Sequence, residues 1–138
     1  KISQDEVRLE GAALECRINA EDADNNFMPS PGKIDQLILP GGPGVRVDTH
    51  VYPGYFISPY YDSMIMKVIT YGKNRTEAIT KMKGALSEIV IDPLKTTVPF
   101  HMQVLNNQKF LRGKYSTSFI DTNYQSAHKA TKKIVKKK

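Results

Sequence analysis

Apolar and polar residues alternate along positions 12–21, the first patterned stretch of the chain. The apolar positions share one parity and are Leu14, Cys16, Ile18 and Ala20. The polar positions have the other parity and are Glu15, Arg17, Asn19 and Glu21. Because successive side chains of a strand point to opposite faces, this pattern predicts a half-buried strand whose polar side chains stand about 7 Å apart in a row.

Three further strands are expected downstream, separated by turns rich in proline and glycine. They cover residues 33–39, 45–51 and 63–71, and residues 51–62 form a loop dense in Tyr, Pro and Gly. Three of the four residues at 41–44 are glycine, which suggests a phosphate-binding loop, but no Gly-Lys-Ser/Thr motif and no helix follow. Turn glycines with positive φ explain this segment without a ligand.

The second half of the chain contains the clearest helix signal. Asn74 is a good N-cap, Glu77 stands in the capping-box position, and the helix is expected to end before Pro93. Its apolar stripe consists of Ile79, Met82, Leu86 and Ile89. This spacing predicts an amphipathic helix that packs on the strands.

A shorter helix fits residues 98–106, with Thr97 as its candidate N-cap. After it we expect a loop around Phe110, an extended segment over 115–120 and a weakly amphipathic helix from Thr122 onward. Short strands followed by helices predict one α+β domain, in which helices flank an antiparallel β-sheet. A parallel, doubly wound fold would need alternating strand and helix units, which are absent.

The net charge of +6 comes from the C-terminal tail rather than from the domain. Six lysines fall within residues 129–138, and residues 1–128 carry equal numbers of basic and acidic side chains. We therefore expect a solvated helical or frayed tail over 123–138 and no nucleic-acid binding, which requires basic residues clustered on a folded face. No apolar run is long enough to span a membrane, so we expect an intracellular protein.

Arg17 is the most suggestive candidate for chemistry. It lies in the middle of the first strand, on its polar face, and its paired N–H donors suit a carboxylate, bicarbonate or enolate oxygen. Composition alone favours the alternative, a structural ion pair with Glu15 or Glu21. Asp62, which follows two tyrosines, fits either a turn cap or a site residue.

Other candidate groups give weaker signals. Cys16 is the single cysteine, and its place in an apolar alternation is typical of a small buried hydrophobe. Arg46 and Asp48 alternate outward with His50 on one predicted strand, which fits solvated surface or an interface. The histidines show no metal-ligand spacing, so no metal site is expected. They are His50, His101 and His128.

Five sequence blocks resemble, in the same order, the C-terminal domain of biotin carboxylase. They are Glu-Cys-Arg-Ile-Asn-Ala-Glu-Asp at 15–22, Pro-Ser-Pro-Gly-Lys-Ile at 29–34, Gly-Gly-Pro-Gly-Val-Arg at 41–46, Pro-Tyr-Tyr-Asp-Ser-Met-Ile at 59–65, and Ile-Asp at 91–92 with Lys-Thr at 95–96. The resemblance implies the end of an upstream ATP-grasp region or a linker over residues 1–10. It implies the C-terminal domain itself over 11–122, followed by the lysine-rich tail.

The resemblance implies the ATP-dependent ligase reaction of biotin-dependent carboxylases. In that family ATP and Mg²⁺ activate bicarbonate to carboxyphosphate, whose CO₂ carboxylates biotin on a carrier protein. Acetyl-CoA carboxylase, and with it fatty acid synthesis, is expected first. Pyruvate carboxylase, propionyl-CoA carboxylase and a non-catalytic dimerisation or binding module are the alternatives. Because the family's ATP-grasp domain lies upstream, this fragment alone is expected to be inactive.

The implied partners are a second copy of the chain, the biotin carboxyl carrier protein or domain, and the carboxyltransferase component, all in the cytoplasm. Arg17 matches the arginine that the family places against bicarbonate and biotin, where it stabilises the biotin enolate. Asp62 falls at the edge of this site as a candidate for substrate binding. Arg46 falls in the homodimer interface, although family members often carry an aromatic residue in place of Pro43. The polar stretch 116–118 gives no basis for assigning an adenine contact.

Overall fold

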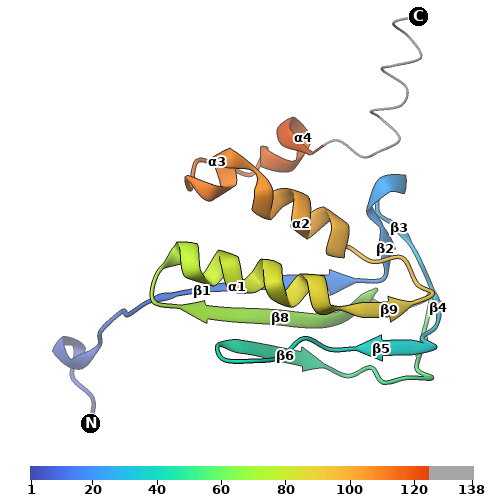
Figure 1. Ribbon diagram of the computed structural model, residues 1–138, viewed down its shortest axis with the longest axis horizontal. Coiled ribbons are helices and arrows are strands. Elements are labelled where there is room, and N and C mark those ends of the chain that lie inside the picture. Colours follow the sequence, from blue (N-terminus) through green and yellow to red (C-terminus); the bar gives the residue numbers. More distant parts are fainter. Residues whose placement is uncertain (125–138) are drawn as a thin grey trace, which may run out of the picture.

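A three-stranded antiparallel sheet forms the centre of the domain (Figure 1). The computed structural model describes residues 1–124 of the chain. The strands of this sheet, in spatial order, are β1 (Ala12–Asn19), β8 (Met64–Gly72) and β6 (Val45–Thr49). All three were expected from the sequence, and the α+β class with flanking helices is confirmed.

Three short antiparallel pairs surround this sheet. The pairs are β2 (Glu21–Asp22) with β3 (Met28–Pro29), β4 (Gly32–Lys33) with β7 (Phe56–Ile57), and β5 (Gln36–Ile38) with β9 (Val90–Asp92). The single strand expected over 33–39 is wrong. Its two halves, β4 and β5, pair with different partners, and such a change of partner leaves no trace in a hydrophobic pattern.

Helix α1 (Arg75–Glu88) packs on one face of the central sheet (Figure 1). Asn74 caps it as predicted, because its Oδ1 accepts the backbone N–H of Glu77 at 3.0 Å. The capping box is only half formed, since the Glu77 carboxylate accepts the N–H of Lys73 rather than that of Asn74. The buried hydroxyl of Thr70 donates to the Ala78 carbonyl at 2.9 Å and thereby fastens the helix to β8.

The hydrophobic core lies between this sheet face, α1 and α2 (Val98–Asn106). Its fully buried side chains are Ile18, Ile34, Ile65, Met66, Val68, Met82, Leu86 and Leu105. Of the predicted stripe of α1, Ile79, Met82 and Leu86 are buried, whereas Ile89 is the C-cap residue because the helix ends at Glu88. Cys16 is buried in the same core, as expected.

The C-terminal part of the described chain departs from the sequence expectations. A short helix, α3 (Gln108–Leu111), stands where a loop was expected. The segment over 115–120, which was expected to be extended, forms no strand, and its last two residues begin α4 (Phe119–Asn123). Phe119 is buried beside the rings of Phe110 and Tyr115, so tertiary aromatic packing decides this segment. The predicted helix from Thr122 onward lies largely, and the lysine-rich tail almost wholly, outside the described residues.

The glycine-rich turn at 41–44 has the backbone geometry that the sequence suggested. Gly42 and Gly44 both have positive φ, at 106° and 77°. A Cβ atom on Gly44 would stand 2.7 Å from the Tyr71 carbonyl oxygen, so a larger residue does not fit there. Strand β6 follows this turn, and its geometry requires no phosphate.

The packing of α1 predicts that Leu86→Ala destabilises the domain strongly. Leu86 is 1% exposed, and its truncation leaves a cavity between helix and sheet. We expect the free energy of unfolding to fall by about 2–5 kcal/mol. Ser87→Ala, at an exposed neighbouring position, is the matched control and should change it by less than about 0.5 kcal/mol. Urea titrations of both variants measure this, and equal effects would contradict the assigned core.

Candidate functional site

The polar face of β1 lies on the side of the sheet opposite to α1. Cys16 and Ile18 are buried beneath the helix, and Arg17 between them is exposed on the outer face. In the register of the sheet, Arg17 stands beside Lys67 of β8, which in turn stands beside Asp48 of β6. The outer face therefore carries a row of charged side chains across all three strands.

The Arg17 guanidinium is held by two contacts. Its Nε donates to Asn19 Oδ1 at 3.1 Å, and its Nη2 donates to both carboxylate oxygens of Asp62, each at 3.2 Å. No residue among 1–124 accepts a hydrogen bond from Nη1. The arginine is thus oriented by its neighbours and keeps N–H donors available for an anionic ligand.

The acidic partner of Arg17 is Asp62, whereas the sequence pointed to Glu15 or Glu21. The pair was missed because 45 residues separate its members and no local pattern joins them. Asp62 is itself anchored, since its Oδ1 accepts the N–H of Met64 at 2.8 Å, which is the turn-cap role expected from the sequence. The two side chains are 51% and 62% exposed, so their ion pair adds at most about 1 kcal/mol to stability and serves mainly to orient Arg17.

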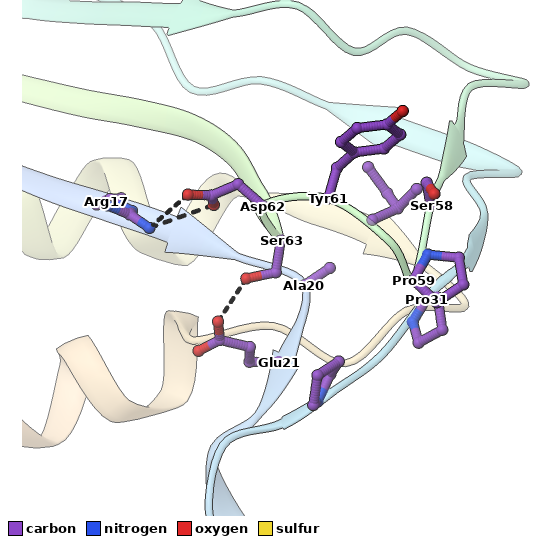
Figure 2. Close-up of a pocket in the computed structure, with 11 residues that line it drawn as sticks. Arg17, Ala20, Glu21, Pro31, Ser58, Pro59, Tyr61, Asp62 and Ser63 are labelled. Carbon is purple, nitrogen blue, oxygen red and sulfur yellow. Dashed lines mark hydrogen bonds and ion pairs between the residues drawn. The ribbon is translucent and has the colours of Figure 1, made fainter.

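A second set of hydrogen bonds continues the polar row beyond Asn19. The Asn19 amide donates to Glu21 Oε1 at 3.0 Å, and the Ser63 hydroxyl donates to the same oxygen. Figure 2 shows the Arg17–Asp62 and Ser63–Glu21 contacts side by side at the end of β1. The backbone N–H of Ala20 also donates to the Ser63 carbonyl at 2.7 Å. Both main-chain and side-chain hydrogen bonds therefore join the segment after β1 to Ser63.

An open cavity of about 310 Å³ adjoins this corner (Figure 2). Its lining residues are Arg17, Ala20, Glu21, Pro29, Pro31, Ile57, Ser58, Pro59, Tyr61, Asp62 and Ser63. One side thus presents charged and polar groups, and the other is lined by prolines and Tyr61. A site of this kind suits a small anion, or a polar ring, held against a fixed cation.

Helix α2 touches the same strand from its free edge, a contact that the sequence reasoning missed. The His101 Nε2 stands 2.9 Å from the Arg17 carbonyl oxygen, and the hydroxyl of the buried Thr97 accepts the N–H of Asn19 at 3.0 Å. Burial lowers the pKa of His101, against the opposing effect of its hydrogen bond to the Arg17 carbonyl. The only signal in the sequence was the four-residue spacing of Thr97 and His101, which puts both on one side of a helix.

Arg46, the candidate interface residue, lies on the outer face of β6. Its Nε and Nη2 donate to the two carboxylate oxygens of Asp48, both at 2.8 Å. This hydrogen bond from Arg46 lowers the pKa of Asp48. His50 lies just after the strand, with its ring 5.2 Å from that of Tyr55. The three residues are exposed and share no contact with Arg17.

The remaining candidates take part in local contacts. Burial raises the pKa of the Cys16 thiol to about 12, so this cysteine is no nucleophile near neutral pH. Ser116 and Ser118 are exposed and hydrogen-bonded to each other. Within residues 1–124, no three His, Cys, Asp or Glu side chains gather closely enough to hold a metal ion. None of the helices in the same part of the chain is both long and apolar enough to cross a membrane.

Comparison with known families matches residues 15–122 to the biotin carboxylase C-terminal domain. This chain belongs to that family. Biotin carboxylase 1 of Bacillus subtilis is 58% identical over 121 residues, which are 88% of this chain and 27% of that protein. A pyruvate carboxylase subunit of Methanothermobacter thermautotrophicus is 48% identical over 136 residues, covering 99% of this chain and 28% of that protein.

Solved structures agree with this assignment. The biotin carboxylase of Campylobacter jejuni, in complex with a β,γ-ATP compound, superposes with a TM-score of 0.83 at 43% identity. The biotin carboxylase domain dimer of Hydrogenobacter thermophilus 2-oxoglutarate carboxylase, in complex with MgADP, ADP and bicarbonate, gives 0.85 at 39% identity. Each match covers 88% of this chain and 27% of the other. This biotin carboxylase C-terminal domain therefore spans about a quarter of the length of its relatives.

Proposed function

We propose that this domain supplies one wall of the active site of a biotin carboxylase, which uses ATP and bicarbonate to carboxylate biotin on a carrier protein. One observation carries the proposal: Arg17 lines a cavity, is fixed there by Asn19 and Asp62, and keeps N–H donors available for a ligand. A relative with bicarbonate bound shares the fold at 39% identity, which supports an anion as the ligand.

Arg17 would act on negative charge at two stages. Its guanidinium would bind bicarbonate, which is itself an anion, and would later stabilise the oxygen of biotin that becomes negative as the ureido nitrogen gives up its proton. A preorganised donor at such an oxygen is worth about 10²–10³ in rate. Biotin supplies the nitrogen that accepts CO₂, and the carboxylate of Asp62 keeps the arginine in place without touching the reacting atoms.

The rest of the active site is assigned to the part of the relatives that this chain does not cover. We assign ATP and Mg²⁺ to an upstream ATP-grasp domain, with residues 1–10 as its end or a linker, and the C-terminal domain proper to residues 11–122. Residues 1–10 are exposed throughout and extend away from the sheet (Figure 1), which supports a connecting role.

We infer that the reaction is the first half of acetyl-CoA carboxylase, and thus serves fatty acid synthesis in the cytoplasm. The 58% identity to a protein named biotin carboxylase supports this choice, and the 48% identity to part of a pyruvate carboxylase makes pyruvate the alternative acceptor. The partners would be the biotin carboxyl carrier protein or domain and a carboxyltransferase component. Assaying the complete enzyme with acetyl-CoA, propionyl-CoA and pyruvate decides between the acceptors.

Arg17→Ala tests the proposed role directly in a full-length protein that carries this domain. We expect biotin carboxylation to slow by about 10²-fold or more, because the fixed cation at the oxyanion is lost. The KM for ATP should stay near the wild-type value. Arg112→Ala, which removes another exposed arginine, is the matched control and should leave the rate unchanged. A carboxylation rate of Arg17→Ala within twofold of wild type would reduce Arg17 to a structural residue.

The outer face of β6 is proposed as the homodimer interface. Its exposed Arg46–Asp48 pair lies on a regular strand, where a two-fold axis can bring the same residues of two copies together. The dimer of the Hydrogenobacter thermophilus domain supports a two-fold assembly in the family.

Sedimentation of the full-length protein at tens of micromolar should therefore show a dimer. Arg46→Glu should shift it toward monomer, because two carboxylates would then stand together on each copy's face. Arg112→Glu makes the same change of charge away from this strand and should leave the dimer intact. A wild-type protein that stays monomeric at this concentration would show that the interface is wrong.

A further inference from the structure

The free edge of β1 is closed by a helix rather than by another strand. β1 is the outermost strand of its sheet, with β8 on one side only. On the other side, the Asn19 N–H donates to Thr97 Oγ1 at 3.0 Å, and the Thr97 N–H donates to the Asn19 carbonyl at 3.1 Å. These bonds satisfy backbone groups that an edge strand otherwise leaves to water or to another chain.

The same helix fixes the backbone of Arg17. The Arg17 carbonyl oxygen stands 2.9 Å from His101 Nε2 and 3.4 Å from Thr97 Oγ1. A carbonyl oxygen only accepts, so Nε2 of His101 carries the hydrogen. The Thr97 hydroxyl bonds both residues, since it accepts the N–H of Asn19 and donates to the carbonyl of Arg17.

We propose that His101, with Thr97, positions Arg17 for biotin carboxylation by holding the main chain from which both its guanidinium and its ligand Asn19 project. This proposal rests on the proposed function, because the role of Arg17 at the anion is part of that proposed function. His101 is a positioning residue and not a catalytic one, since its ring bonds the main-chain carbonyl of Arg17 and otherwise packs against Phe100.

Three features of the contact favour this role over simple docking of α2. The side chain of Arg17 is 51% exposed, so packing around it does little to fix the guanidinium and the backbone must do more. The Nε of Arg17 is oriented by Asn19, whose N–H and carbonyl are both bound by Thr97. A displacement of about 1 Å at a reacting group can lower a rate by 10²-fold. A small shift of the main chain at residues 17–19 would therefore lower the carboxylation rate.

The test compares His101→Gln with His101→Leu in the full-length protein. Gln keeps an N–H donor at the end of a chain of similar length, and Leu keeps only apolar volume. We expect His101→Leu to lower kcat for biotin carboxylation at least tenfold with an unchanged KM for ATP, and His101→Gln to stay within twofold of wild type. The proposal would be overturned in favour of a purely structural contact by either of two results. One is an equal loss of kcat in both variants, and the other is a lower melting temperature and weaker ATP binding of His101→Leu that accompany its loss of kcat.

A double-variant cycle with Arg17→Ala shows whether His101 acts through Arg17. We expect His101→Leu to have no further effect on the carboxylation rate once Arg17 is Ala, because the positioned group is gone. Losses that multiply would overturn the proposal. An Arg17→Ala protein of normal activity would instead refute the proposed function itself, so the two failures are distinguishable. Should His101→Leu fail to fold, Thr97→Ser and Thr97→Val make the same comparison of retained and removed hydroxyl.

Discussion

The register of β1 against β8 is the constraint on which the rest of the domain depends. Cys16 faces Val68 and Ile18 faces Met66 beneath α1, which places Arg17, opposite Lys67, on the outer face. Because side chains alternate with a period of two, a slip of one residue would bury the guanidinium and expose the core. The hydrophobic burial that stabilises the sheet therefore also fixes the orientation of the candidate catalytic cation.

Elements whose periodic pattern runs without a break over many residues were predictable from the sequence. Elements that are very short, or that depend on tertiary packing, were not. The strand containing Arg17, the capped helix α1 and the bounds of α2 follow from alternation, a cap and an apolar stripe. The two-residue strands and β9 are too brief to show a period, and α4 depends on the burial of Phe119. Arg17 was identifiable by its place in the pattern. Asp62 was also a candidate site residue, but its contact with Arg17 and that of His101 were not predictable, because these residues lie 45 and 84 positions away in sequence.

Arg17 is fixed from two directions by weak contacts that act together. On the outer face Asp62 and Asn19 bind the guanidinium, and at the strand edge His101 binds the main chain. None of these contacts is strong by itself, since the ion pair is largely exposed and each neutral hydrogen bond contributes about 1 kcal/mol. Their combined effect is geometric: they hold the guanidinium in one orientation, which is what the proposed role of Arg17 at an anion requires.

On the proposed function, this domain supplies part of a biotin carboxylase site, and the ATP-binding part lies elsewhere in the protein. The most direct measurement is fixation of labelled bicarbonate into free biotin with MgATP, by a full-length protein and by the 138-residue chain alone. We expect ATP-dependent fixation by the full-length protein and none above the buffer rate by the 138-residue chain. Fixation by the chain alone that survives repurification, or none by the folded full-length protein, would contradict this expectation.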